Sequence, residues 1–280
     1  DYAGTGEEDM IRDITIGQYY PAKSVLHRLD PRVKLVGTLL YLISLFLFSS
    51  IPGYVMTTLF LIIIIKMSRV PFSFIVRGLK PVIMLLMITV LFNLFLTRDG
   101  EVLFHAWIFT ITEGGLRTAV YMAIRLIYLI IGSSLMTFTT TPNELTDGIE
   151  KLLGPLNKIH VPVHEVAMIM SIALRFIPIL LEETDKIMKA QIARGADLES
   201  GNMIQKAKSM IPILVPLFVS AFRRANDLAM AMEARCYRGG EGRTKMKPLQ
   251  YSKNDRIAYI VVIVYVILVV VVGRCVPVHI

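Results

Sequence analysis

Five stretches of the chain are apolar enough to be membrane-spanning segments. They cover roughly residues 33–48, 54–65, 81–96, 116–138 and 257–272. A spanning helix needs about 17 to 25 apolar residues, so the first two are short. The uncharged turn Ser49–Gly53 between them predicts a tight helical hairpin, which either spans the membrane or is re-entrant. The last stretch is almost entirely Val, Ile and Tyr, but in lipid only a helix satisfies its own backbone. The pattern therefore predicts an all-α integral membrane protein with about five transmembrane helices.

Basic residues indicate which side of the membrane each loop faces. Four precede the first span and four separate the second span from the third: Lys23, Arg28, Arg32 and Lys34, then Lys66, Arg69, Arg77 and Lys80. The loop between the third and fourth spans has acids instead, including Asp99, Glu101 and Glu113. Lys and Arg accumulate on the cytoplasmic side of membrane proteins. The N-terminus is therefore expected in the cytoplasm and, after five spans, the C-terminus outside.

The segment 139–256 carries most of the charge, together with long apolar stretches. Pro142 after Thr141 predicts the start of a short helix that ends near Leu153. Two helices of about 45 to 50 Å are then expected, over residues 162–194 and 200–235. Both become more polar toward their C-terminal ends, so each is expected to begin near the membrane and end in the cytoplasm.

These patterns predict four parts of the chain. They are a cytoplasmic N-terminal segment (1–32), four transmembrane helices (33–138), a large helical cytoplasmic segment (139–256) and a C-terminal transmembrane helix (257–280).

Composition and charge exclude several other classes of protein. Hydrophobic residues make up 54% of the 280 residues and charged residues only 19%, which excludes a disordered chain or a secreted globular domain. Two cysteines cannot form a disulfide framework. A net charge of +8 would suggest nucleic acid binding in a soluble protein. In a membrane protein it reflects bases gathered on the cytoplasmic side, so no nucleic acid partner is expected.

The two long predicted helices end in similar triplets. The first closes on Ala193-Arg194-Gly195 and the second on Ala234-Arg235-Cys236. One interpretation is purely structural, because arginine in a last turn complements the helix dipole and glycine stops a helix. The other is a paired binding function, in which each guanidinium enters an acidic or carbonyl-lined groove of a partner.

Together with two further motifs, the triplets resemble a known family. The additional motifs are Leu-Asp-Pro-Arg-Val-Lys at Leu29–Lys34 and Ala-Leu-Arg-Phe-Ile-Pro at Ala173–Pro178. Over about Tyr20 to Val272 the chain is similar to the transmembrane T component of energy-coupling factor transporters, the ABC-type vitamin and metal-ion importers of prokaryotes. The family usually has glycine or a similar small residue where this chain has Cys236.

The resemblance implies a non-catalytic coupling subunit in a prokaryotic cell membrane. In the family, two long coupling helices dock on two ABC ATPase subunits (A and A'), and the same protein holds a substrate-binding S component. The ATPase-binding residues of this chain would then be Ala193, Arg194, Gly195, Ala234, Arg235 and Cys236. The arginines would enter the grooves, and their small neighbours would allow close approach. The S component would determine the substrate.

Neither a catalytic nor a cofactor-binding residue is predicted. The glycine-rich run 239–245 lacks the order of a phosphate loop, so ATP would be bound by partner subunits. His164-Glu165 lacks the second histidine of a zinc motif, because position 168 is Met168, and no metal site is expected. Arg125, within the fourth span, either contacts the bundle or extends toward the interface. The role of Arg175 stays open. A conventional ABC permease and a multispan membrane enzyme are the alternative functions.

Overall fold

The computed structural model describes most of the chain. The described residues are 19–79, 82–96, 102–106, 109–196, 202–239, 246 and 248–275. The first 18 residues of the predicted N-terminal segment and most of the glycine-rich run lie outside them. The chain divides into two compact units, one formed by residues 1–152 and 249–280 and the other by residues 153–248.

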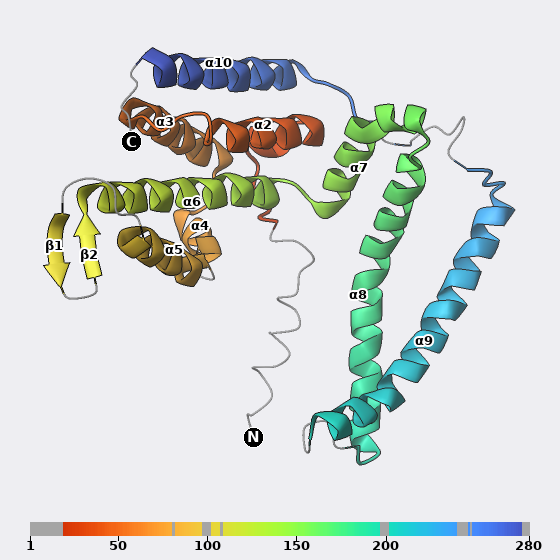
Figure 1. The fold of residues 1–280 in the computed structure, drawn as a ribbon. Helices are drawn as coiled ribbons and strands as arrows, with labels where there is room; N and C mark the ends of the chain where they lie inside the picture. The colour runs from red at the N-terminus through yellow and green to blue at the C-terminus, as the bar shows by residue number, and fades with distance from the viewer. Residues whose placement is uncertain are drawn as a thin grey trace. The chain divides into compact units, whose positions relative to one another are not determined.

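The first unit is helical apart from one short hairpin (Figure 1). Its elements are η1 (Leu26–Arg28), α2 (Pro31–Ser44), α3 (Ile51–Ser68), α4 (Phe72–Leu79), α5 (Ile83–Leu96), β1 (Val102–Ala106), β2 (Phe109–Thr112), α6 (Glu113–Thr139), α7 (Pro142–Leu153) and α10 (Lys253–Cys275). The strands β1 and β2 pair antiparallel between α5 and α6. The short helix α7 ends where the sequence predicts.

Helix lengths confirm an all-α membrane protein but refine the predicted spans. Within the described residues, α3, α6 and α10 are long and apolar enough to cross a membrane, as are the two long helices of the second unit. Helices α2 and α5 have 14 residues each, about 21 Å, which is short of a hydrocarbon core of about 30 Å. The predicted turn Ser49–Gly53 is wrong in its second half, because α3 already begins at Ile51. Pro52 fits that first turn, where no backbone N–H is needed.

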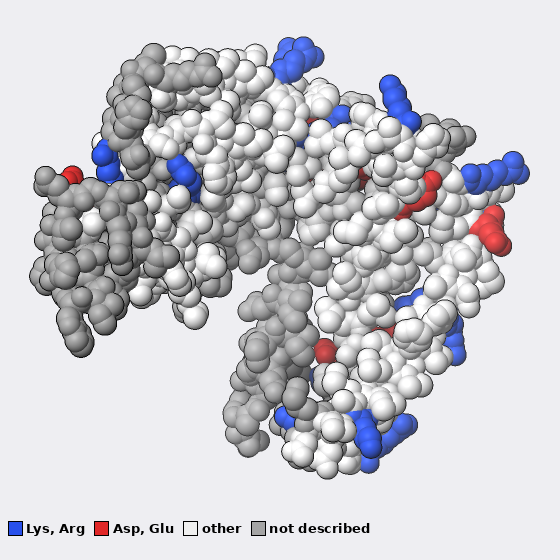
Figure 2. All heavy atoms as spheres, in the orientation of Figure 1, with Lys and Arg blue, Asp and Glu red and all other residues white. Residues whose placement is uncertain are grey.

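Much of the described surface is suited to lipid. Figure 2 shows broad areas without charged side chains. Large apolar side chains are exposed on α5 and α10, for example Met84 at 73% and Ile260 at 61%. Exposed apolar area on this scale marks a membrane or partner surface.

Helices α2 and α10 lie side by side and run in the same direction. Near their starts the backbone N–H of Asp30 donates to Asp255. Further along, a Cβ on Gly37 would contact Val262, and a Cβ on Gly273 would contact Phe48. Helix α6 runs antiparallel to α2, since Lys34 bonds the carbonyl of Thr139 near its end.

The core of this unit joins α2, α3, α6 and α10 through aromatic rings. The rings of Phe60 and Tyr265 stack with centroids 4.0 Å apart. The Tyr265 hydroxyl accepts a hydrogen bond from Ser44 at 3.2 Å and pairs with Thr57 at 3.1 Å. Tyr41 packs beside Tyr265 and donates to the carbonyl of Tyr128 at 3.1 Å. The tyrosine hydroxyls therefore have partners inside an otherwise apolar core.

Gly132 is required for the close approach of α6 to α2. A Cβ at this position would lie 2.3 Å from the ring of Tyr41, which is buried. We expect Gly132→Ala to lower stability by about 1 to 3 kcal/mol, measured as thermal unfolding in detergent. Gly78→Ala is the control, because its Cβ would find its nearest neighbour at 3.6 Å. An unchanged midpoint for Gly132→Ala would contradict this packing.

The second unit is an antiparallel helical hairpin. It contains η3 (Gly154–Ile159), α8 (Val163–Ala193) and α9 (Met203–Ala234). Pro216 has no N–H to donate to the carbonyl of Pro212 within α9. The side chain of Gln191 on α8 donates to that carbonyl at 3.3 Å. Glu183 on α8 accepts from Ser220 at 2.7 Å and from Arg224 at 2.6 Å. These contacts fix the register of the two long helices.

Candidate functional site

The two long helices end in the same backbone motif. In α8 the N–H of Gly195 donates to the carbonyl of Ile192 at 2.9 Å, and that of Ala196 donates to Gln191 at 3.0 Å. In α9 the N–H of Cys236 donates to Glu233 at 2.8 Å, and that of Tyr237 donates to Met232 at 3.0 Å. Both are Schellman motifs in the same register. The two sequence triplets therefore form equivalent structures, in which arginine is the last residue before the backbone becomes left-handed.

The third residue of each triplet has a left-handed backbone. The φ angle is +83° at Gly195 and +55° at Cys236. A glycine adopts this conformation without strain, whereas a residue with a Cβ does not. The left-handed backbone therefore favours glycine at this position, a reason separate from the close approach that the family resemblance implies, although Cys236 and, at the end of α3, Arg69 adopt it too. Cys236 has a Cβ, so its backbone is strained in the conformation that Gly195 adopts freely.

Substitutions at these two positions should change stability in opposite directions. Gly195→Ala should destabilise the end of α8 by about 1 kcal/mol, because a Cβ there meets no atom within 4 Å and only the backbone is strained. Cys236→Gly should stabilise the end of α9 by up to about 1 kcal/mol. Hydrogen exchange of the last-turn amides measures both effects. Equal exchange in wild type and both variants would contradict the assignment.

The arginines of both triplets project into solvent. Arg194 and Arg235 are exposed, as are Ala193, Gly195, Ala234 and Cys236. Within the described part of the chain, neither guanidinium forms a hydrogen bond or an ion pair. Each offers five N–H donors in a planar fork that matches a carboxylate. The structure therefore leaves both triplets accessible to partners, at opposite ends of the antiparallel hairpin.

A groove of about 700 Å³ lies beside the Arg235 end. Its walls come from the first half of α8 and the end of α9, with apolar side chains such as Phe176 and Met232. Arg175 and Arg238 line it together with Arg235, and none of the described lining residues is acidic. The structure thus brings Arg175, whose role the sequence left open, to one of the two triplets. The groove is complementary to an apolar segment that carries carboxylates.

The Asp30-Pro31-Arg32 motif starts α2. Asp30 accepts from the Arg32 backbone N–H at 2.9 Å and from its guanidinium at 2.8 and 3.0 Å. Burial alone would raise the pKa of Asp30, but the hydrogen bonds from the Arg32 side chain and backbone outweigh it and hold the pKa below its ordinary value. The motif is thus a helix cap, with Pro31 in the first turn.

Sequence reasoning missed the residue that connects this cap to the last helix. Asp255 is 1% exposed and accepts from the Asp30 N–H at 2.8 Å. Its other oxygen accepts from the N–H and hydroxyl of Ser252 at 2.6 and 2.7 Å. Arg32 lies over the ring of Tyr251 at 3.9 Å. The spacing Ser252-x-x-Asp255 before an apolar run is a capping-box signal that the sequence does contain.

Arg125 contacts the bundle, which decides between its two interpretations. Its guanidinium donates to the carbonyl of Phe48 at 3.1 Å, in the turn between α2 and α3. It also lies 5.7 Å from the ring of Phe46. The arginine therefore satisfies a backbone carbonyl in the turn that follows α2.

The described residues contain no cluster that could hold a metal ion. No group of three His, Cys, Asp or Glu side chains comes together among them.

Comparison with known proteins identifies the family. The model of the cobalt transport protein family matches residues 22–246. The energy-coupling factor transporter transmembrane protein EcfT of Clostridium kluyveri is 58% identical over 258 residues, which cover 92% of this chain and 96% of the relative. The protein of the same name from Bacillus subtilis is 50% identical over 246 residues, covering 88% and 93%. That from Lactococcus lactis subsp. cremoris is 44% identical over 260 residues, covering 93% and 98%. The chain belongs to this family of energy-coupling factor transmembrane proteins.

Membership confirms the resemblance read from the motifs. The chain is the transmembrane component of an energy-coupling factor transporter and a multi-pass membrane protein. The match over residues 22–246 includes both triplets and both long helices. The relatives are named as transporter transmembrane proteins, which agrees with a non-catalytic subunit.

Proposed function

We propose that this chain transmits ATP-driven movement from two ABC ATPase subunits to a substrate-binding S component, for uptake of a vitamin or metal ion. The main support for this proposal is the pair of equivalent, exposed Ala-Arg-small helix ends on α8 and α9. Two like docking points fit two like partners. ATP is bound by those partners, and this chain contributes no catalytic residue.

Each docking contact is made by a guanidinium at the tip of a long helix. Arg194 and Arg235 enter acidic or carbonyl-lined grooves of the ATPases, one subunit at each end. Ala193, Gly195, Ala234 and Cys236 have short side chains that let the partner backbone approach. A charge-assisted hydrogen bond contributes about 1.5 to 3 kcal/mol. At the α9 end, Arg175 and Arg238 add charge beside Arg235, so the two docking points are not identical.

The hairpin transmits displacement because its helices are tied to one another. The contacts of Glu183 with Ser220 and Arg224, and of Gln191 with Pro212, connect α8 to α9 along their length. When ATP binding brings the two ATPases together, both helix ends move with them. The segment 139–256 lies in the cytoplasm in this proposal, and the N-terminus is cytoplasmic. The S component binds to exposed apolar surface and is reoriented by the movement.

Reconstituted transport tests the proposed function. This chain, two ATPases and an S component from the same genome are placed in proteoliposomes, and uptake of that S component's substrate is followed. Uptake should require ATP and all four subunits, and this chain alone should neither hydrolyse ATP nor transport. ATP-dependent uptake that persists without this chain would contradict the proposal. So would transport by this chain with the ATPases but without the S component, as expected of a conventional permease.

A further inference from the structure

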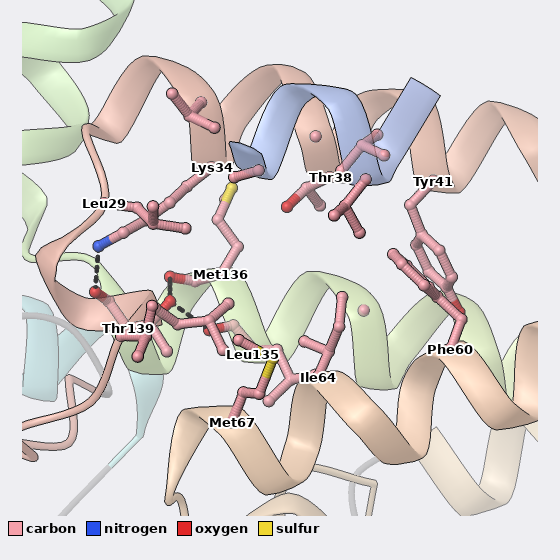
Figure 3. Close-up of a pocket in the computed structure, with 18 of the residues that line it drawn as sticks. Leu29, Lys34, Thr38, Tyr41, Phe60, Ile64, Met67, Leu135, Met136 and Thr139 are labelled. Carbon is pink, nitrogen blue, oxygen red and sulfur yellow. Dashed lines mark hydrogen bonds between the residues drawn. The ribbon is translucent and has the colours of Figure 1, made fainter. Parts of the chain in front are cut away.

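An apolar cavity lies inside the first unit, here called the membrane unit, whereas the triplets belong to the second. It measures about 250 Å³ and is bounded by η1, α2, α3, α6 and α10. Figure 3 shows Lys34 and Thr139 at one end and Tyr41 and Phe60 at the other. Val33 and Leu61, at 3% and 4% exposure, belong to its buried wall. Apart from Lys34, none of the described residues that line it carries a charge.

The cavity reaches the surface of the unit. Four of its lining side chains are about half exposed: Val25, Met67, Ile257 and Val261. They come from the segment before η1, from α3 and from α10, and both of these helices are long and apolar enough to span a membrane. A long apolar molecule in the bilayer can therefore enter from the side. Water is not expected to fill this cavity, because apolar cavities stay dry.

The Lys34 end of the cavity is basic. Lys34 donates to the carbonyls of Thr139 at 2.7 Å and His27 at 3.2 Å, which leaves one of its three donors. Four exposed bases lie at the helix ends that meet here, at the end of η1, in the last turn of α3 and in the first turn of α10: Arg28, Lys66, Lys253 and Arg256. Asp30 is paired with Arg32, whereas Asp255 accepts only from neutral donors and, like Glu144, keeps a charge that acts on Lys34. These four bases and Lys34 outnumber the two acids that Arg32 does not pair, so this end of the cavity has a net positive charge.

From this geometry we infer a binding site for an anionic phospholipid. One acyl chain fills the cavity between α2, α3, α6 and α10, and the phosphate headgroup lies at the basic rim. An apolar cavity of about 150 Å³ is enough to take up benzene, so 250 Å³ accommodates a substantial part of an acyl chain. The bilayer supplies acyl chains at high concentration. Each rim base attracts an anionic lipid headgroup by about 1 kcal/mol. The bound lipid packs α3 and α10 against the segment that starts α2.

Lipid retention on a cavity-filling variant tests this inference. The whole chain is purified in detergent with added phosphatidylglycerol or phosphatidylcholine, and bound lipid is counted by native mass spectrometry. Wild type should retain one phosphatidylglycerol in preference to phosphatidylcholine. The double variant Thr38→Leu/Ala258→Leu fills the cavity from α2 and α10 and should reduce retention at least about tenfold.

Matched control variants distinguish the effect of filling the cavity from general effects of substitution. Thr89→Leu/Thr137→Leu adds two leucines outside the cavity, at a half-buried position of α5 and an exposed position of α6, and it should retain lipid like wild type. Lys66→Gln/Lys253→Gln removes two rim charges and should weaken phosphatidylglycerol retention by roughly fivefold per charge. Equal retention of both lipids, or of phosphatidylglycerol by wild type and the filled variant, would overturn the inference.

Photo-crosslinking on wild type gives a test that needs no variant to fold. Phosphatidylglycerol with a diazirine in the middle of one acyl chain is added to the purified chain. The sample is irradiated, and the labelled peptides are sequenced. We expect labels on lining residues such as Leu61, Ile64 and Val262. Labels confined to exposed residues outside the cavity, such as Met84 and Phe92, would show only annular lipid and would overturn the site.

Discussion

Replacing both Arg194 and Arg235 by Glu should abolish capture of the ATPase subunits by this chain. Both side chains are exposed at the ends of long helices, so the change turns two attractions into two repulsions. If each charge-assisted contact contributes about 1.5 to 3 kcal/mol, losing both lowers affinity about 100-fold or more. Each single variant retains one docking point and should capture an intermediate amount. The Arg235 variant should lose less than the Arg194 variant, because Arg175 and Arg238 remain beside it.

Co-purification of the co-expressed subunits measures this effect. The tagged chain is isolated and the ATPases that remain bound are quantified for wild type, both single variants and the double variant. Arg223→Glu is the matched control, an exposed arginine on α9 away from the triplets. It makes the same charge change and should leave capture intact. If the double variant captures ATPases like wild type, the triplets are only helix ends.

Asp255→Ala should produce the largest loss of stability in the membrane unit. The carboxylate is buried and accepts from the backbone N–H groups of Asp30 and Ser252 and from the Ser252 hydroxyl. Alanine leaves the N–H groups of Asp30 and Ser252 without this acceptor, at about 1 to 3 kcal/mol each, and removes one half of the capping box of α10, because Ser252 still accepts from the N–H of residue 255. The expected loss is about 3 to 5 kcal/mol.

Unfolding in detergent, followed by temperature or denaturant, measures this loss. Asp255→Asn keeps one oxygen acceptor and should lie between wild type and Asp255→Ala. Asp227→Ala on α9 is the control, because Asp227 is exposed. If Asp255→Ala lowered the free energy of unfolding by less than about 1 kcal/mol, this carboxylate would not be what holds α2 and α10 together.

Sequence patterns predicted the long helices and the twelve-residue helix α7, but not every short element. Strong apolar runs placed α3, α6 and α10, and the ends of α8 and α9 fell within a few residues of the observed ones. The eight-residue helix α4 was missed, since it is shorter than the window that periodicity needs. Helix α3 starts three residues before the predicted position 54, because Pro52 and Gly53 are typical of a turn. In that context proline occupies a first turn instead.

Individual polar residues show why the site was only partly predictable. The triplets are local signals, and both their position and their helix-ending geometry follow from nearby residues. The contact of Arg125 with Phe48, and that of Asp255 with Asp30, join positions 77 and 225 residues apart. No local pattern contains such a pairing. The groove that unites Arg175 with Arg235 depends likewise on how α8 and α9 pack.

Hydrogen exchange on the wild-type chain tests ATPase docking most directly, because it needs no substitution. The chain is held in lipid nanodiscs, and amide exchange is compared with and without the two ATPase subunits. We expect protection in peptides that cover residues 190–196 and 231–238, which contain both helix ends. The exposed start of α9, residues 204–208, should exchange as before. Protection elsewhere, with both triplets unchanged, would contradict docking through Arg194 and Arg235.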